Sequence, residues 1–514
     1  MAVPRHRCGS GHRTEPPTME GYAGVRRAVV DIGSNSIRLV VFGGPARVPV
    51  AVFNEKVLSG LGSTLHDNDR LDPAGAALAL TNLERFATLL KIMAVEQVDV
   101  VATAAVRDAR DGESFVRDLY RRTGLDARIL TGAEEAALSA LGVIAGIPKV
   151  DGIMGDLGGG SLELAQIAAG KTTERTTLPL GPLRLQTPVI KAKAQIDAAF
   201  AGLDWLKTAR DGMLYLVGGS WRALARIHMA QTDYPLRLVH RYRLRRHDML
   251  SLTDLVARQS PESLRRLPGV PPRRRGVLPH ASLLLNRLLR HIQPHSVEFC
   301  AYGLREGLLY ADLPPEVQSE DSLLAACGDI NAQASRFPGL APALHRWTAN
   351  LVDGEGKHGT LLREAAGLLS DIAWRAHPDH RANDAFRQVF THPGLLVEHR
   401  DRAFLALAVY HRYTGKEMPQ VLDQLHGLIR GEEVQRARIL GLAFRLGETI
   451  SGGDPTTLDR FALLRRKDEG RLCLRHTAAD RALLGEVVVK RLNGLATTMA
   501  LRPAIEEGHG PGSE

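Results

Sequence analysis

Short apolar runs alternate with amphipathic stretches through the first part of the chain. The runs at 28–32, 37–42, 98–103 and 127–130 have the length and branched residues of strands, whereas apolar residues recur at helical spacing over 74–94, 114–122 and 134–145. Strands that alternate with helices predict an α/β unit, in which helices cover a sheet.

A second α/β unit repeats the first in outline. Strands are predicted at 152–155, 162–167, 214–217 and 296–300, and a helix after Leu304 closes the unit. Each unit opens with two apolar runs separated by a few small polar residues, which predicts a hairpin. The pattern therefore indicates two α/β lobes in succession.

Beyond about Leu313 the pattern changes to long amphipathic runs. Helical spacing covers 322–336, 340–353, 358–374, 402–412, 419–430 and 434–449. We expect a helical domain there, followed by a short α/β tail around 473–501 and a loose acidic end at 506–514. Residues 1–26 are rich in Pro, Gly and charge without periodicity, which predicts a disordered segment.

Length and composition are those of an ordinary multidomain protein. The chain has 514 residues, too many for one core, with 44% hydrophobic and 24% charged residues. No apolar run approaches the roughly 20 residues that cross a bilayer, and the N-terminus lacks a signal-peptide core, so we expect a cytoplasmic protein with no membrane partner. Cys8, Cys300, Cys327 and Cys473 form no C-x-x-C pair, which predicts free thiols.

The net charge of +9 is concentrated in part in two arginine-rich stretches, at 240–247 and 265–275. Such stretches are either solvated helix faces or a binding path for a phosphate-rich ligand, and the sequence leaves both interpretations open.

The candidate chemistry lies in the two predicted hairpins. In the second hairpin a triple glycine at 158–160 separates Asp156 from Glu163, and the bare N–H groups of such a turn can bind an anion directly. A tight turn would bring both carboxylates to one end of a cleft, where Mg²⁺ can bind through them and through substrate phosphates. The first hairpin has Asp31 and Gly33 in the same arrangement.

Five motifs resemble, in order, those of the exopolyphosphatase and guanosine pentaphosphate phosphatase (Ppx/GppA) family in the actin-like ATPase superfamily. They are DIGSNS at 31–36, TAAVRDA at 103–109, LTGAEEA at 130–136, DLGGGSLE at 156–163 and GLREG at 303–307. The resemblance is specific over 27–312 and rests on pattern alone over 320–500.

The resemblance implies an α/β fold of two actin-like (ribonuclease H-like) lobes, with a phosphate-binding cleft between them and a mainly helical, HD-like C-terminal domain. We divide the chain into a disordered segment at 1–26, lobe I at 27–138, lobe II at 139–313, a helical domain with a short α/β tail at 320–503, and a flexible tail at 504–514. Because Pro378 separates His377 from Asp379, the helical domain has no adjacent His-Asp pair there, and we expect it to bind or dimerise.

The resemblance also assigns site residues. Glu135 resembles the family's water-activating carboxylate, and Asp156, Glu163 and Asp31 are assigned to the metal. The phosphate-binding set consists of Ser34, Asn35, Ser36, Arg107, Gly158, Gly159, Gly160, Ser161, Gly218, Gly219 and Ser220. Glu134 points about 100° away from Glu135 on a helix, so one of the two should face the cleft and the other a cap or the solvent.

Several assignments have a structural alternative. Asp31 is either a metal-side carboxylate or a turn-forming residue, and Arg107 either grips a phosphate or pairs with a nearby aspartate. Residues 218–220 form either a wall of the cleft or an ordinary strand–helix turn. For Arg305 and Glu306 we favour a structural ion pair.

The implied activity is Mg²⁺-dependent hydrolysis of the terminal phosphate of inorganic polyphosphate by water that Glu135 activates. Mn²⁺ is an alternative ion, and a need for K⁺ stays open. A guanosine pentaphosphate 5′-phosphohydrolase with the same site and a non-hydrolytic sensor are the alternatives. A sugar kinase is disfavoured because lobe I has no evident sugar-binding insertion. A homodimer is a family-level expectation, and no nucleic-acid partner is expected.

Overall fold

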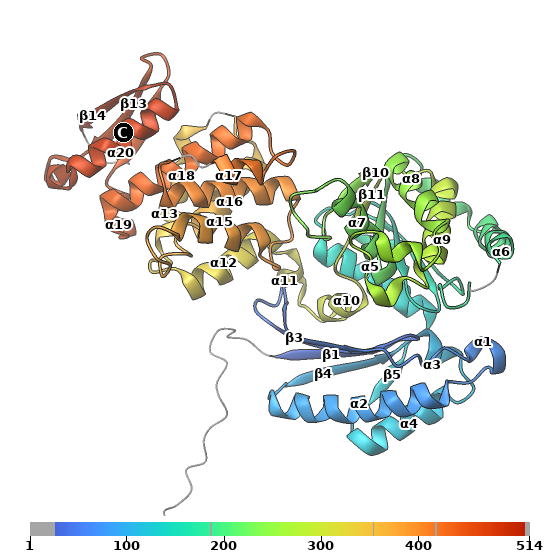
Figure 1. The fold of residues 1–514 in the computed structure, drawn as a ribbon. Coiled ribbons are helices and arrows are strands. Elements are labelled where there is room, and N and C mark those ends of the chain that lie inside the picture. Colours follow the sequence, from blue (N-terminus) through green and yellow to red (C-terminus); the bar gives the residue numbers. More distant parts are fainter. Residues whose placement is uncertain (1–25, 186–187, 353, 417–418, 509–514) are drawn as a thin grey trace, which may run out of the picture.

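The computed structural model describes residues 26–185, 188–352, 354–416 and 419–508 (Figure 1). The segment expected to be disordered at 1–26 lies outside these ranges except for Arg26, as do Cys8 and residues 509–514. Two α/β lobes, a helical domain and a small terminal sheet follow one another along the chain (Figure 1).

Lobe I is built on a five-stranded sheet of order β3-β2-β1-β4-β5. The strands are β1 (Arg27–Ile32), β2 (Ile37–Gly43), β3 (Val50–Val57), β4 (Gln97–Ala102) and β5 (Ala127–Ile129), and the helices are α1 (Leu65–Asn68), α2 (Pro73–Ile92), α3 (Ala104–Asp108) and α4 (Gly112–Thr123). Helices α2 and α4 cover one face of the sheet (Figure 1). Asp72 starts α2 by accepting the N–H of Gly75 at 2.6 Å, and Pro73 occupies the first helical position.

Lobe II has a six-stranded sheet of order β10-β11-β9-β6-β7-β8. Its strands are β6 (Gly152–Leu157), β7 (Leu162–Ala168), β8 (Lys171–Leu178), β9 (Met213–Val217), β10 (Arg243–Arg245) and β11 (Ser296–Phe299), and its helices are α6 (Val189–Ala201), α7 (Gly219–Gln231), α8 (Arg246–Ala257) and α9 (Leu278–Ile292). Strands β8-β7-β6-β9 repeat the order β3-β2-β1-β4, so the repeat predicted from the sequence is a repeat of topology. The pattern did not predict β3 and β8, because both are edge strands with many exposed polar residues.

Two helices connect the lobes, α5 (Gly132–Gly146) and α10 (Leu304–Ala311). They pack so closely that a Cβ atom on Gly142 or Gly307 would lie 2.1 or 1.8 Å from a main-chain oxygen of the facing segment. Helix α5 packs on β7 and β8 of lobe II, although its first half falls within the range assigned to lobe I. Helix α10 places Leu308 and Leu309 in a buried cluster with Val29 and Val40 of lobe I.

The helical domain has one large core. Its helices are α11 (Pro315–Ser319), α12 (Ser322–Ala334), α13 (Leu340–Trp347), α14 (Lys357–Leu368), α15 (Arg381–Thr391), α16 (His399–Tyr413), α17 (Pro419–Asp423), α18 (Gly431–Ser451), α19 (Pro455–Leu458) and α20 (Glu486–Thr498). Helix α16 is central, because every residue from 402 to 410 is buried. Helix α15 was not predicted, and the helices expected at 358–374 and 419–430 end earlier than expected, at Leu368 and Asp423.

The chain ends in a three-stranded sheet of order β12-β13-β14, formed by β12 (Ala462–Arg466), β13 (Arg471–His476) and β14 (Arg502–Glu507). The expected flexible tail at 504–514 is therefore wrong for 504–507, because these residues pair in parallel with β13. Glu506 accepts a hydrogen bond from Arg466 at 2.9 Å, so its negative charge is balanced within the sheet.

Two other expectations concern thiols and membranes. Cys300, Cys327 and Cys473 are buried and unpaired, as predicted. Within the described ranges, no helix combines the length and the apolar character that a membrane crossing requires.

Candidate active site

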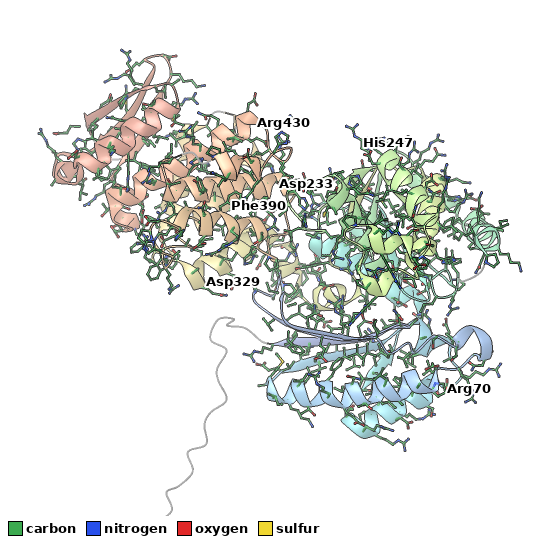
Figure 2. The ribbon with its side chains drawn as sticks, in the orientation of Figure 1. Arg70, Asp233, His247, Asp329, Phe390 and Arg430 are labelled. Atoms are coloured by element: carbon green, nitrogen blue, oxygen red, sulfur yellow. The ribbon has the colours of Figure 1, made fainter. Side chains whose placement is uncertain are left out.

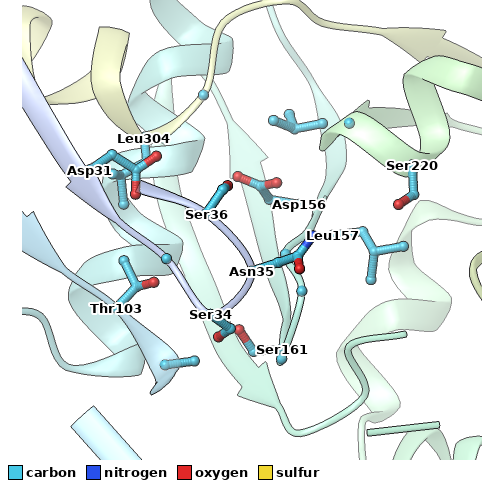
Figure 3. A pocket seen from close by; sticks show the side chains of 18 of the residues that line it. Asp31, Ser34, Asn35, Ser36, Thr103, Asp156, Leu157, Ser161, Ser220 and Leu304 are labelled. Carbon is cyan, nitrogen blue, oxygen red and sulfur yellow. The ribbon is translucent and has the colours of Figure 1, made fainter. Parts of the chain in front are cut away.

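The two predicted hairpins share one turn geometry. In lobe I the N–H of Gly33 donates to the carbonyl of Ser36 at 3.0 Å, and in lobe II the N–H of Gly158 donates to the carbonyl of Ser161 at 3.1 Å. Both turns point into the space between the lobes, where Figure 3 shows residues of the first turn close to Ser161 of the second.

In lobe II the register places Asp156 directly opposite Glu163. Residues opposite each other on antiparallel strands point to the same face, so the two carboxylates lie side by side as expected. Asp156 accepts a hydrogen bond from the Ser139 hydroxyl at 2.7 Å. Glu163 is 1% exposed, and its Oε1 atom has no hydrogen-bond partner among the residues that the structure describes.

In lobe I the residues that lie opposite one another on neighbouring antiparallel strands carry different charges. Arg38 on β2 lies opposite Asp31 on β1 and opposite Lys56 on β3, so the three side chains share one face. Asp31 makes no turn-forming hydrogen bond within the described part of the chain, and it faces the cleft. The turn-forming alternative therefore has no hydrogen bond to support it among these residues, and the metal-side role of Asp31 stays a prediction.

The two turns and the start of α5 enclose a cavity of about 210 Å³. Of the predicted residues it is lined by Asp31, Ser34, Asn35, Ser36, Glu135, Asp156, Gly158, Gly159, Gly160, Ser161, Glu163, Gly219 and Ser220. Asp31 and Asp156 approach it from opposite lobes, with Ser36 between them in the view of Figure 3.

Glu135 is oriented by the start of α5. Thr131 and Glu134 form a capping box, in which the Thr131 N–H donates to the Glu134 carboxylate at 2.8 Å and the Glu134 N–H donates to the Thr131 hydroxyl at 3.2 Å. Glu135, the next residue, is 8% exposed and faces the cleft. As expected, one of the two glutamates caps the helix and the other faces the cleft.

The start of α5 is also fixed from β8. The hydroxyl of Thr177 donates to the carbonyl of Gly132 at 2.7 Å, and a Cβ atom on Gly132 would lie 2.6 Å from that hydroxyl oxygen. Thr177 is the cross-strand partner of Glu163. The glycine in the Thr131–Gly132 pair therefore lets the helix carrying Glu135 approach the strands carrying Asp156 and Glu163.

Negative charge at these carboxylates is only partly neutralised, because the Arg107 guanidinium pairs with Glu135 at 2.9 Å. Burial raises the pKa of Glu135 to about 7 against the opposing effect of Arg107, and burial together with the neighbouring carboxylates raises the pKa of Glu163 well above its usual value. Burial also raises the pKa of Asp156. No three His, Cys, Asp or Glu side chains in the described ranges form a ready metal cage. Hard oxygen ligands and the unpartnered Glu163 oxygen nevertheless fit Mg²⁺, which commonly takes only one or two carboxylates.

The same cavity is also lined by cations, which the site residues predicted from the sequence did not include. Its lining includes Arg38, Lys56, Arg222, Arg274 and Arg305. Burial is the main reason that the pKa falls to about 10 for Arg38 and Arg274 and to about 8 for Lys56, with mutual repulsion second. The lining therefore combines incompletely neutralised carboxylates with five cations, and a metal ion and a polyanion together would balance these charges.

Arg107 has the aspartate contact of its structural alternative, residues 218–220 divide between their two alternatives, and the favoured Arg305–Glu306 ion pair is contradicted. Arg107 does not line the cavity, because its guanidinium donates to Glu135 at 2.9 Å and to Asp108 at 3.2 Å. Gly218 also lies outside the lining, and its φ of +101° makes it a strand–helix turn residue. The favoured Arg305–Glu306 ion pair is absent from the described residues, since Glu306 caps α10 and Arg305 lines the cavity.

The basic stretch at 240–247 does not form a phosphate path along its length. Arg241 binds the buried Glu298 at 2.8 Å and Glu398 of the helical domain at 2.9 Å, and Arg243 binds the same two carboxylates. These contacts attach the helical domain to lobe II. His247, at the end of the stretch, lies on the outer surface of lobe II (Figure 2).

Where the stretch meets the helical domain, His399 has a hydrogen-bond partner at each ring nitrogen. His399 accepts the Tyr234 hydroxyl at 2.8 Å and donates to the carbonyl of His240 at 3.0 Å. Burial lowers the pKa of His399 to about 4, which is consistent with this neutral form.

Comparisons with known proteins find similarity over both the lobes and the helical domain. The model of the Ppx/GppA phosphatase family matches residues 23–316, and the model described as exopolyphosphatase, C-terminal, matches residues 323–504. The chain is 25% identical over 451 residues to a guanosine-5′-triphosphate,3′-diphosphate pyrophosphatase of Pseudoalteromonas atlantica, a match covering 81% of this chain and 85% of that protein. It is 26% identical over 311 residues to exopolyphosphatase 1 of Mycobacterium tuberculosis, covering 57% and 89%.

Two further proteins show how much of a relative the chain covers and which fold it shares. Retrograde regulation protein 2 of Saccharomyces cerevisiae is 26% identical over 336 residues, and the match covers 58% of this chain but only 57% of that protein. The crystal structure of an exopolyphosphatase from Cytophaga hutchinsonii has a TM-score of 0.51 at 23% identity and covers 56% of this chain and 97% of its own. This likeness concerns the fold, and it confirms the expected actin-like pair of lobes.

Proposed function

Because the chain belongs to the Ppx/GppA phosphatase family, we propose that it is an exopolyphosphatase, which releases orthophosphate from the end of inorganic polyphosphate in the cleft between its lobes. The observation that supports this proposal is the joint lining of one cavity by four carboxylates and five cations. A terminal phosphoryl group needs a metal-side carboxylate cluster, and the rest of a polyanion needs positive charge.

Each group has a role in the proposed reaction. Glu135 orients a water molecule and accepts its proton as the water oxygen bonds to the terminal phosphorus, while the bond from that phosphorus to the bridging oxygen breaks. The N–H groups of Gly159 and Gly160 stabilise charge on the transferred group. Asp156 and Glu163 would hold Mg²⁺, which supplies charge neutralisation at the phosphoryl oxygens when bound.

Three arginines are suited to the phosphates next to the broken bond. Arg222 and Arg305 lie near enough to Asp156 for their charges to act on its pKa, and Arg38 lies opposite Asp31. Arg107 holds Glu135 by an ion pair at 2.9 Å and is a positioning residue in this proposal. Its predicted role as a phosphate ligand stays a prediction.

The second candidate is a guanosine pentaphosphate 5′-phosphohydrolase, favoured by the match to the Pseudoalteromonas atlantica protein, which spans 81% of this chain. Orthophosphate release from long polyphosphate and from guanosine pentaphosphate, each with and without Mg²⁺, distinguishes the two. A preference for the nucleotide would overturn the polyphosphate proposal. The homodimer, Mn²⁺ use and K⁺ requirement stay predictions, and light scattering and ion titrations would test them.

Glu135→Gln tests hydrolysis against a non-hydrolytic sensor. We expect turnover to fall at least about 100-fold while polyphosphate binding is retained, because the amide keeps the shape but cannot accept the proton. Glu134→Gln is the matched control, since Glu134 caps the helix and points away from the cleft. Unchanged turnover in Glu135→Gln would remove the catalytic assignment.

A further inference from the structure

Asp108 connects the two lobes through two arginines. Its Oδ1 atom accepts the Nε–H of Arg107, also in lobe I, at 3.2 Å, and its Oδ2 atom accepts a hydrogen bond from Arg184 of lobe II. The three side chains are between 20% and 35% exposed, so water screens these contacts less than it screens a fully exposed pair. None of the three lines the cavity. Any effect of these residues on the reaction therefore passes through another residue.

Arg107 carries this contact to the proposed base. Its Nη1 atom donates to the Glu135 carboxylate at 2.9 Å and to the carbonyl of Leu130 at 3.2 Å, while its Nε atom is held by Asp108. Because a guanidinium is planar and its N–H groups have a fixed relative geometry, the contact with Asp108 sets the direction of the N–H that meets Glu135. Without Asp108, the orientation of Arg107 depends only on the Leu130 carbonyl and on Glu135 itself.

Arg184 lies on a segment that is fixed to the triple-glycine turn of lobe II. The N–H of Leu183 donates to the carbonyl of Gly159 at 3.0 Å, and the N–H of Arg184 donates to the carbonyl of Gly181 at 2.9 Å. A Cβ atom on Gly181 would lie 2.3 Å from the Gly159 carbonyl oxygen, so the segment packs directly on the turn. Arg184 and the glycine turn are therefore expected to move together.

The glycine turn also meets lobe I directly. A Cβ atom on Gly160 would lie 2.9 Å from the Ser34 hydroxyl oxygen, and one on Gly159 would lie 3.4 Å from Cβ of Asn35. The lobes thus touch at the two turns and again at the ion pair between Asp108 and Arg184. A displacement that separates the turns would also separate this ion pair.

We propose that Asp108 and Arg184 are positioning residues, which make the orientation of Glu135 depend on contact between the lobes. When the glycine turn of lobe II lies against lobe I, Arg184 fixes Asp108. Asp108 in turn fixes Arg107, and Arg107 orients the Glu135 carboxylate toward the attacking water. This inference rests on the proposed function and adds to it a requirement that the lobes be in contact for the proton to be accepted efficiently.

The first test separates turnover from binding in the full-length protein. For Asp108→Asn and for Arg184→Gln we expect kcat for orthophosphate release from polyphosphate to fall about tenfold with KM within about twofold, because neither side chain lines the cavity. Arg184→Lys keeps a donor for Asp108 and should keep kcat within about threefold of the wild type. Asp69→Asn is the matched control, since it removes the exposed Arg110–Asp69 pair within lobe I. Wild-type kcat in both test variants, or a rise in KM alone, would overturn the proposal.

A double variant tests the route through Arg107. Arg107→Gln alone should lower kcat, because it removes the ion pair with Glu135. Adding Arg184→Gln should then have little further effect on kcat, since the two arginines act in series on the same carboxylate. A further loss of about tenfold in the double variant would mean that Arg184 acts by another route, and the positioning role would be wrong.

Hydrogen exchange measures the contact between the lobes without any turnover. Asp108→Asn, a change in lobe I, should speed exchange of the Leu183 and Arg184 amides in lobe II severalfold, because their segment loses a contact with lobe I. Asp69→Asn should leave this exchange unchanged. Equal exchange in Asp108→Asn and the wild type would overturn the inter-lobe contact. A wild-type protein that releases no orthophosphate contradicts the proposed function instead, so the two failures are distinguishable.

Discussion

The opening hairpins of lobe I and lobe II have the same turn hydrogen bond, the same length and the same place in their sheets. The second residue after the turn differs, because it is Arg38 in lobe I and Glu163 in lobe II. Each of these residues lies opposite an aspartate, Asp31 or Asp156. The backbone thus provides two equivalent positions next to an aspartate, and the side chain at that position is a cation in lobe I and a carboxylate in lobe II.

The strands next to the hairpins extend the contrast. The cross-strand partner of Arg38 on β3 is Lys56, whereas the cross-strand partner of Glu163 on β8 is Thr177. The Thr177 hydroxyl fixes the start of α5 and so positions Glu135. The hairpin row of lobe II thereby brings two carboxylates next to the candidate base, and the matched row of lobe I combines Asp31 with two cations. At matched positions the two copies of the fold therefore differ in charge.

The strongest way to break this contrast is to remove the charge of Glu163. We expect Glu163→Gln to lower kcat/KM on polyphosphate about 1000-fold, because the buried carboxylate is the lobe II ligand proposed for the metal. The variant should also need more Mg²⁺ for half-maximal rate, which a phosphate-release assay over a Mg²⁺ titration measures.

Glu174→Gln is a suitable control for that experiment, since Glu174 is an exposed glutamate on the adjacent strand β8. A Glu163→Gln protein that keeps wild-type rate and Mg²⁺ dependence would contradict the metal assignment and leave Glu163 a structural residue.

The matched change in lobe I is Arg38→Gln, with a smaller expected effect. Arg38 binds substrate charge and takes no proton, so KM should rise about 30-fold while kcat changes less. Full Michaelis–Menten curves on one polyphosphate length separate the change in KM from the change in kcat. Arg121→Gln, on the outer face of α4, is the control for the change in net charge. A loss confined to kcat would place Arg38 with the reacting groups instead.

Much of this comparison could be predicted from the sequence. An apolar run, an aspartate, small residues and another apolar run define each hairpin locally, so the turns and the pairing of Asp156 with Glu163 follow from alternation alone. The capping role of Glu134 follows equally from its spacing to Thr131. These features depend on residues that are near one another in the chain.

The cations that line the cleft could not be predicted in the same way. Arg38, Lys56, Arg222 and Arg305 carry no local signal, because they converge from four separate elements only when the lobes fold together. The stretch at 240–247 illustrates the reverse problem. Its arginines resemble a phosphate path in composition, but the folded chain presents Glu298 and Glu398 to Arg241, and a sequence pattern does not show distant partners.

The smallest expected effect concerns pH and Lys56. Burial, then the charges of Arg274 and Arg38, lowers the pKa of Lys56 to about 8 in the free protein. Below that pH the ammonium group is charged and helps to bind a polyanion, and above it the charge is lost. KM for long polyphosphate should therefore rise severalfold between about pH 7.5 and about pH 9.5, because the substrate must then supply the energy to reprotonate the lysine.

Replacing Lys56 by arginine sharpens the prediction, because a guanidinium stays charged throughout this range. In Lys56→Arg the rise in KM above about pH 8 should disappear while the pH dependence of kcat, which depends on Glu135 and the metal side, stays as in the wild type. If both proteins show the same rise in KM, the titrating group lies elsewhere. Lobe I would then bind substrate through the charge of Arg38 and not through Lys56. The difference in charge between the two lobes would then be limited to the hairpin strands and would not extend to β3.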